Sequence, residues 1–255
     1  MKQSIRDSLK SFFRRFPYIL LLVLLISVPV NVIQTCFVDV RFQSIDVAQL
    51  EEDPGGVLSK VLIYYFLLFL LSIVLNMLFI GVMLLRRQDY DGTLVRFRDI
   101  FEESLVLLPK VWLTQLLSGI IVAIGFTFFM LPGIILYYIF YMVPYAVTYR
   151  KEWGRRGLYV ASRYPKKHGR TVVGVILFDL VYRIVITAGI SALVYFVPLS
   201  GSAYTIFSVG VYCLRDLLFC IPFSIIGGIA LSLPIEVQNP DGTVSHYGNT
   251  DDSQE

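Results

Sequence analysis

The sequence predicts an all-α polytopic membrane protein: six transmembrane helices in three hairpins, with amphipathic elbow helices at the membrane interface. The composition is 56% hydrophobic and 16% charged, whereas soluble domains are about 45–50% apolar and about 25% charged. Six long apolar runs take up more than half of the 255 residues, and Lys and Arg are concentrated in alternate loops between them. These features leave no room for a sizeable soluble catalytic domain.

We interpret the first apolar run as a retained membrane anchor and not as a cleaved signal peptide. Five basic residues precede an apolar stretch over residues 18–30, which continues to about residue 38 without a small-x-small cleavage pattern. Gln34 and Thr35 stand before Cys36, where a lipoprotein signal would place a small residue. The first run therefore counts as the first transmembrane helix.

Six segments are candidate spans, and most can cross about 30 Å of hydrocarbon at about 1.5 Å per residue. They are residues 17–38, 61–85, 109–131, 133–149, 171–197 and 203–235. Leu131, Pro132 and Gly133 predict a tight turn between the third and fourth spans, because proline pre-shapes a turn and glycine permits a sharp one. The sixth segment is long enough to require tilt or a bend at Pro222.

The distribution of basic residues predicts the orientation. Eighteen Lys and Arg residues lie before span one, in residues 86–110 and in residues 150–170, against two in residues 39–60. The positive-inside rule therefore places both termini in the cytoplasm and residues 39–60 outside. We expect one membrane domain over residues 1–236 and a disordered, acidic cytoplasmic tail over residues 237–255.

Amphipathic segments precede the odd-numbered spans. In residues 4–16 and 94–108 the apolar side chains share one helical face and the charged ones lie off it, and a proline follows each segment. A weaker third copy lies before the fifth span. We therefore predict three units, each an interfacial helix plus a membrane hairpin; the alternative is that all three are ordinary basic flanks.

Catalytic motifs are scarce. Asp89 to Val95 matches the Asp-x-Asp-Gly-Thr nucleophile motif of haloacid dehalogenase-like phosphatases, but that motif needs a buried strand before it and a Rossmann-like domain after it. We interpret it as a loop in which Asp91 or Thr93 caps the next helix. The histidines and cysteines form no metal, hydrolase or disulfide pattern, so we expect no catalytic residue, no metal and no cofactor.

Four charged residues fall inside the last two spans. Asp179 and Arg183 stand one helical turn apart in the fifth, and Arg215 and Asp216 are adjacent in the sixth. An unpaired charge at a helix centre costs roughly 2.5–3.5 kcal/mol on insertion scales, so each needs a partner. Our structural interpretation is an ion-pair clasp between the two helices. The functional alternative is a proton or ion relay or a polar substrate site. A third interpretation is a sixth segment that breaks near Arg215 into two half-helices.

Tyrosine recurs every fourth residue along the fourth span, at Tyr137, Tyr141, Tyr145 and Tyr149. A stripe of this kind supports either helix packing with interfacial anchoring or a face that lines a lipid or substrate path. The first interpretation is the more common one. Pro144 interrupts the stripe.

Residues 92–230 resemble a known family, the membrane domain of glycerophosphodiester phosphodiesterases and the related YciC-type small inner-membrane proteins of bacteria. The residues that carry the resemblance are the segment before Pro109, Leu131-Pro132-Gly133-Ile134, Pro144, Gly154, Ser162 and Gly169. Leu158 departs from the usual alanine, and the phosphodiesterase barrel of some relatives has no counterpart here. The resemblance implies a six-helix bacterial plasma-membrane protein without assigned chemistry.

The sequence thus favours a non-enzymatic integral membrane protein, an accessory or scaffold factor of the bacterial envelope or its lipids. Membrane lipids are its expected partners, together with protein partners or further copies of the chain, and no nucleic acid is expected. The alternative is a small transporter or channel that uses the buried Asp and Arg residues of spans five and six.

Overall fold

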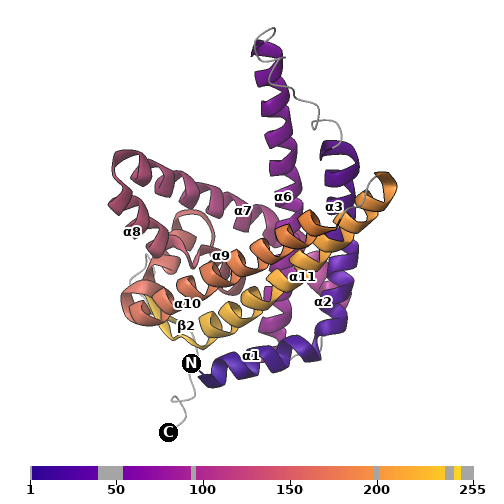
Figure 1. The fold of residues 1–255 in the computed structure, drawn as a ribbon. Helices are drawn as coiled ribbons and strands as arrows, with labels where there is room; N and C mark the ends of the chain where they lie inside the picture. The colour runs from indigo at the N-terminus through magenta and orange to yellow at the C-terminus, as the bar shows by residue number, and fades with distance from the viewer. Residues whose placement is uncertain (1, 40–53, 93–95, 198–200, 239–243, 248–255) are drawn as a thin grey trace.

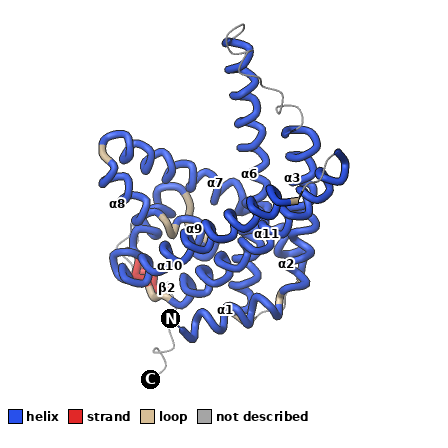
Figure 2. Tube along the Cα trace, in the orientation of Figure 1, coloured by secondary structure: helices blue, strands red, loops and turns tan. Residues whose placement is uncertain are grey.

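The computed structural model describes residues 2–39, 54–92, 96–197, 201–238 and 244–247. In chain order its elements are α1 (Lys2–Arg14), α2 (Phe16–Leu22), the π-helix η1 (Val23–Ser27), α3 (Val28–Ile33), the π-helix η2 (Gln34–Asp39), α6 (Pro54–Tyr90), α7 (Phe97–Phe128), α8 (Met130–Phe140), α9 (Val143–Arg150), α10 (Gly154–Phe196), α11 (Gly201–Ser232), β1 (Ile235–Gln238) and β2 (Val244–Tyr247). Figure 2 shows that the described chain is helical apart from short loops and one strand pair.

Within the described residues, six helices are long and apolar enough to cross a membrane, so the predicted all-α polytopic fold class is confirmed. They cover Phe16–Val38, Gly55–Tyr90, Phe97–Phe128, Met130–Arg150, Gly154–Phe196 and Ser202–Ser232. Several are longer than the predicted spans because the helices continue into the flanking polar segments. Residues 54–60, for example, belong to the predicted outer loop but form the first turns of α6, which corrects that boundary. Residues 40–53 of the loop lie outside the described part of the chain.

Consecutive spans lie side by side as three hairpins (Figure 1). The composite first span packs against α6, α7 pairs with α8, and α10 runs beside α11. The last helix also contacts α1, α3 and α6. It therefore joins the last hairpin to the first one.

α1 is the amphipathic helix predicted over residues 4–16, and it lies across the ends of the spans along α11 (Figure 1). Ser8 and Phe12 are buried against the bundle, whereas Arg6 and Lys10 are exposed. Phe13, which was expected on the apolar face, is 68% exposed because consecutive helical residues do not share a face.

The second interfacial helix, predicted over residues 94–108, is not a separate element. α7 continues without a break from Phe97 through Pro109, although proline removes a backbone hydrogen bond inside a helix. Leu107 and Val111 on either side of the proline are buried. Tertiary packing therefore holds the helix together where the sequence favours an end.

The third predicted unit is marked off by a bend inside α10. His168 has the non-helical angles φ −127° and ψ 41°. Pro165, three residues earlier, lacks the N–H that would bond back to the carbonyl of residue 161, which weakens the helix at this point. The first part of α10 is thus an amphipathic stretch over residues 154–167, and the span follows it.

The turn between the third and fourth spans lies at Phe129 and not at Leu131, Pro132 and Gly133, which corrects the prediction. Phe129 is extended, with φ −157° and ψ 146°, and joins α7 to α8. The three predicted residues form the first turn of α8, where a proline costs no helical hydrogen bond. Gly133 instead permits close packing, because a Cβ there would collide with the Phe126 ring.

The β1–β2 hairpin corrects the prediction of a wholly disordered tail over residues 237–255. The strands pair antiparallel, with Ile235 opposite Tyr247 and Gln238 opposite Val244. β1 alternates apolar and polar residues, which is typical of a strand and was overlooked because the segment follows a long apolar run. Residues 239–243 and 248–255 lie outside the described part of the chain.

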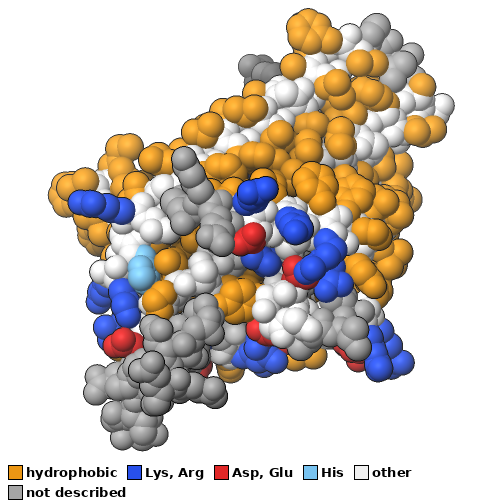
Figure 3. All heavy atoms as spheres, turned by 90° about the horizontal axis from the view of Figure 1, so that it is seen from below, with side chains coloured by type: hydrophobic (Ala, Val, Ile, Leu, Met, Phe, Trp, Pro, Cys, Tyr) orange, Lys and Arg blue, Asp and Glu red, His pale blue; other side chains and the backbone are white. Residues whose placement is uncertain are grey.

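The hydrophobic core lies in the half of the bundle nearest α1. Its fully buried side chains include Leu84, Ile100, Tyr164 and Ile226. The opposite halves of the helices expose apolar side chains, as expected for surfaces that face lipid. Seen from the α1 end, Lys and Arg side chains gather on one face with hydrophobic side chains around it (Figure 3).

Candidate functional site

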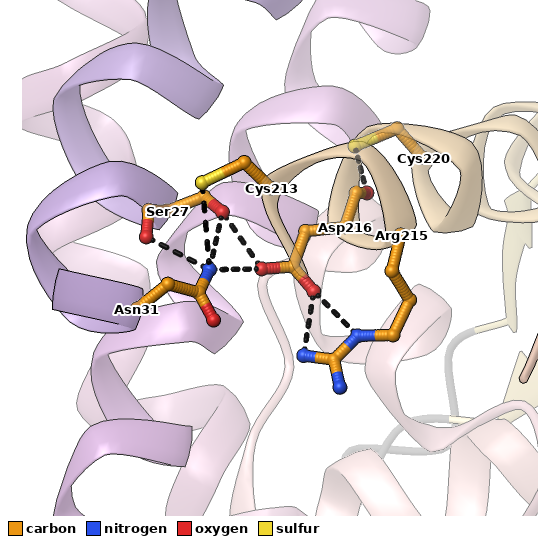
Figure 4. Close-up of polar contacts among 6 residues, drawn as sticks. All are labelled: Ser27, Asn31, Cys213, Arg215, Asp216 and Cys220. Atoms are coloured by element: carbon orange, nitrogen blue, oxygen red, sulfur yellow. Dashed lines mark hydrogen bonds and ion pairs between the residues drawn. The ribbon is translucent and has the colours of Figure 1, made fainter. Parts of the chain in front are cut away.

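Asp216 is the centre of a buried polar site between α11 and the first span (Figure 4). Its side chain is fully buried, and its Oδ2 accepts hydrogen bonds from Ser27 Oγ at 2.7 Å and from Asn31 Nδ2 at 2.8 Å. Both donors belong to the first span. Asp216 therefore ties the first membrane helix to the last one.

The other carboxylate oxygen of Asp216 is held by Arg215. Arg215 Nη2 and Nε donate to Oδ1 at 3.0 Å and 3.2 Å. The guanidinium also lies over the Tyr212 ring, 5.1 Å from its centroid. Both oxygens of Asp216 thus have donors, and the site carries no net charge.

The irregular first span places Ser27 and Asn31 on Asp216. Ser27 ends the π-helix η1, and Asn31 lies one turn later in α3, where its Nδ2 also donates to Ser27 Oγ at 2.9 Å. Pro29 near the start of α3 removes an N–H that an uninterrupted helix would use, and π-helical turns are frequent at such sites. Neither donor was predicted from the sequence, where their signal is two polar residues four apart in an apolar run.

Asp179 forms a second polar site with partners on α10 and beside α8. Arg183 Nε donates to both carboxylate oxygens at 2.9 Å, and the Tyr141 hydroxyl donates to Oδ2 at 2.8 Å. The Arg183 guanidinium lies over the rings of Phe219 and Phe223 on α11, 5.4 Å and 5.3 Å from their centroids. This site connects the fourth, fifth and sixth spans.

The four predicted charges do find partners, but the predicted clasp between α10 and α11 is wrong. The ion pairs are Asp179 with Arg183 and Arg215 with Asp216, each within one helix. The reason is the spacing of the residues along each helix. Arg183 lies four positions after Asp179, on the same helical face, and the long side chain of Arg215 reaches the carboxylate of the adjacent Asp216. Each ion pair is thereby closed within its own helix, and the contacts to other helices come from uncharged hydroxyl and amide donors and from aromatic rings.

The tyrosine stripe is divided by a break between α8 and α9. Tyr137 is 47% exposed, whereas Tyr145 and Tyr149 are buried. Tyr137 packs edge-on against Tyr141 with ring centroids 5.9 Å apart, and the Tyr145 and Tyr149 centroids are 6.4 Å apart. Burial of the last two rings favours helix packing over a path lined by four tyrosines.

Gly227 and Gly228 let α11 approach two other helices closely. A Cβ on Gly227 would collide with the Tyr149 hydroxyl, and one on Gly228 would collide with Ser8 Oγ and lie 2.8 Å from Arg86 Nε. The Tyr149 hydroxyl is buried and has no hydrogen-bond partner among the described residues. These glycines therefore set the distance of α11 from α9, α1 and α6.

Asp89, from the phosphatase-like motif, is held by arginines. Its side chain is 4% exposed and pairs with Arg14, with Arg15 at 3.2 Å and with Arg86 at 3.7 Å. Two of these arginines come from the end of α1 and the residue after it, so Asp89 fixes the interfacial helix to α6. Asp91 pairs with Arg87 at 3.6 Å. It does not cap α7: the N-cap residue is Arg96, without a side-chain cap, and Thr93 lies outside the described residues.

Metal-binding chemistry has little support in the described part of the chain. There, no three His, Cys, Asp or Glu side chains come together closely enough to hold a metal ion. Cys220 is buried, and its Sγ lies 3.2 Å from the Asp216 carbonyl oxygen, which is a packing contact for a small side chain.

Taken together, the helices and these sites define a multi-pass helical membrane protein whose internal charges join its helices. No protein-family model matches the chain, and no match was found among curated proteins or among solved structures. The resemblance to the glycerophosphodiester phosphodiesterase membrane domain therefore stays a prediction.

Proposed function

We propose that the protein is a non-enzymatic accessory or scaffold factor of the bacterial envelope or its lipids. One observation carries the proposal: Asp179 and Asp216, the two acids deep in the spans, already have donors on both carboxylate oxygens. A buried acid that serves as a relay needs a position open to a proton or an ion. Acids with complete sets of partners instead support a structural role.

The basic face supports an orientation with both termini in the cytoplasm, and the proposed bacterial plasma-membrane location rests on the family resemblance. α1 and the first part of α10 lie at the lower end of the molecule in Figure 1, which is the end where Lys and Arg gather in Figure 3, and Arg15 directly after α1 pairs with Asp89. Cytoplasmic loops carry such an excess, and anionic lipids attract it. Membrane lipids are the proposed partners, with protein partners or further copies of the chain as additional ones; no nucleic acid and no cofactor is proposed.

Cysteine labelling tests this orientation. In a Cys36→Ser background, Ser59→Cys near the start of α6 should react with a membrane-impermeant maleimide in intact cells, because that end projects away from the basic face (Figure 1). Lys167→Cys on α10 should react only after the cells are opened. Labelling of Lys167→Cys in intact cells would contradict the proposed orientation.

A small transporter or channel is the second candidate, and the π-helical segment at Ser27 specifically favours it, because π-turns are frequent at functional sites. Proteoliposomes distinguish the two. We expect proton and alkali-ion flux no higher than in protein-free liposomes, both for the parent and for Asp216→Asn. A parental flux that disappears in a folded Asp216→Asn variant would replace the scaffold proposal with the transporter.

A further inference from the structure

A basic cleft lies where α10 bends towards its membrane span. Arg163, Lys166 and Lys167 line it from α10, and Ile235 and Glu236 line it from β1, around a volume of about 290 Å³. The three cations come directly before the bend at His168. The cleft is therefore at the end of the span and on the end of the molecule that carries the basic face.

The strand side of the cleft is fixed to α10 by two polar contacts. His168 Nε2 lies 2.9 Å from the Pro234 carbonyl oxygen, and Lys167 Nζ lies 3.3 Å from a Glu236 carboxylate oxygen. Ile235 between them is 1% exposed. The cleft thus has a helix wall and a strand wall that two polar contacts join.

The charges of the cleft are unbalanced. Among the described residues that line it there are three cations and one carboxylate, and that carboxylate is engaged with Lys167. Arg163 is oriented by Tyr159, whose ring centroid lies 4.6 Å from the guanidinium carbon. Its Nε is buried and has no hydrogen-bond partner in the described part of the chain. A guanidinium and two lysines that line one cleft are groups that bind phosphate.

We propose that this cleft binds a phosphate-bearing anion, such as the headgroup of an anionic phospholipid, and that Glu236 competes with the anion for Lys167. The volume equals roughly ten water molecules at about 30 Å³ each, which leaves room for a phosphate with a small alcohol. This proposal rests on the lipid-directed function proposed above. It adds the chemical group, a phosphate, that the protein would recognise.

Binding measurements on the full chain in a neutral detergent at 0.15 M salt test the proposal. The probes are inorganic phosphate, dioctanoyl phosphatidylglycerol and, as a zwitterionic control, dioctanoyl phosphatidylcholine. We expect the Kd for phosphatidylglycerol to be lower than that for phosphatidylcholine. Lys166→Gln should raise the Kd for phosphatidylglycerol about fivefold, and the double variant Lys166→Gln/Lys167→Gln should raise it about 25-fold. The reason is that a basic residue near a membrane surface contributes about 1 kcal/mol.

Glu236→Gln should change the Kd for phosphatidylglycerol in the opposite direction. Removing the internal competitor should tighten phosphatidylglycerol binding about fivefold, the effect of one freed lysine. Arg170→Gln is the matched control, because Arg170 is exposed on the same helix but does not line the cleft. It should leave the Kd unchanged. If Arg170→Gln weakens binding as much as Lys166→Gln, the effect belongs to the general basic face and the cleft is not the site.

The probes also separate the two sources of phosphate. Binding of phosphatidylglycerol without inorganic phosphate assigns the cleft to a lipid headgroup, and binding of both assigns it to the phosphate group itself. Binding of neither anion by a protein that elutes as a single folded species overturns the cleft proposal. That result would leave the scaffold function standing, because the flux and labelling experiments do not depend on this cleft.

Discussion

Replacing Asp216 with leucine should lower the free energy of unfolding by about 3–5 kcal/mol, the cost of leaving one member of a buried ion pair without its partner. Arg215 would lose its carboxylate in a part of the chain surrounded by other helices and lipid. Ser27 and Asn31 would lose less, because they still bond to each other. Denaturant titration of the detergent-solubilised protein, followed by circular dichroism, measures the effect.

The double variant Arg215→Leu/Asp216→Leu should recover most of this loss, because removing both charges of a buried pair is often nearly neutral. Combining Asp216→Leu with Arg183→Leu is the control. Those two residues belong to separate ion pairs, so their effects should add within about 0.5 kcal/mol. Recovery in this crossed double variant would instead indicate one shared clasp between α10 and α11.

Gly227→Ala should lower the free energy of unfolding by about 1–3 kcal/mol, the usual cost of overpacking a well-packed core. The added methyl group collides with the Tyr149 hydroxyl, which is buried between α9 and α11. Shifting either helix would disturb the packing of Tyr145 against Phe223, whose ring centroids are 6.2 Å apart. The same denaturant titration measures the loss.

Tyr149→Phe should rescue Gly227→Ala, because it removes the atom that the new methyl group meets. Alone, it should change stability little, since the hydroxyl has no hydrogen-bond partner among the described residues. Gly228→Ala is the matched control. Its Cβ meets Ser8 and Arg86, so Tyr149→Phe should not rescue it. Equal rescue of both glycine variants would mean that Tyr149 acts through general loosening of the core.

The membrane fold was predictable because its signals are local. Apolar runs of about twenty residues and the Lys and Arg between them identify spans without any knowledge of packing. Boundaries were less predictable where packing overrides propensity: α7 continues through Pro109, and α6 begins seven residues before the predicted span. The strand pair after the sixth span was missed because a short strand gives a weak signal beside a long hydrophobic run.

The charged residues of the site were predictable, and their partners were not. Asp179, Arg183, Arg215 and Asp216 stand out because charge is rare in an apolar span. The hydroxyl and amide donors do not stand out, because a single Ser, Asn or Tyr is ordinary in a helix. Ser27 meets Asp216, 189 residues away, only through the packing of the first span on the last. Such pairing depends on the tertiary arrangement and on the π-turn at η1.

The length of α6 sets a condition on the bilayer. Its 37 residues extend about 55 Å at about 1.5 Å per residue, against about 30 Å of hydrocarbon. Near its start it exposes Leu58, Leu62 and Phe66. The polar end of α6, Arg86 to Tyr90, extends beyond the hydrocarbon, but the apolar residues 61–85 still span about 37 Å, so the helix must tilt or thicken the surrounding lipid. Thin bilayers should therefore increase the tilt of this second span.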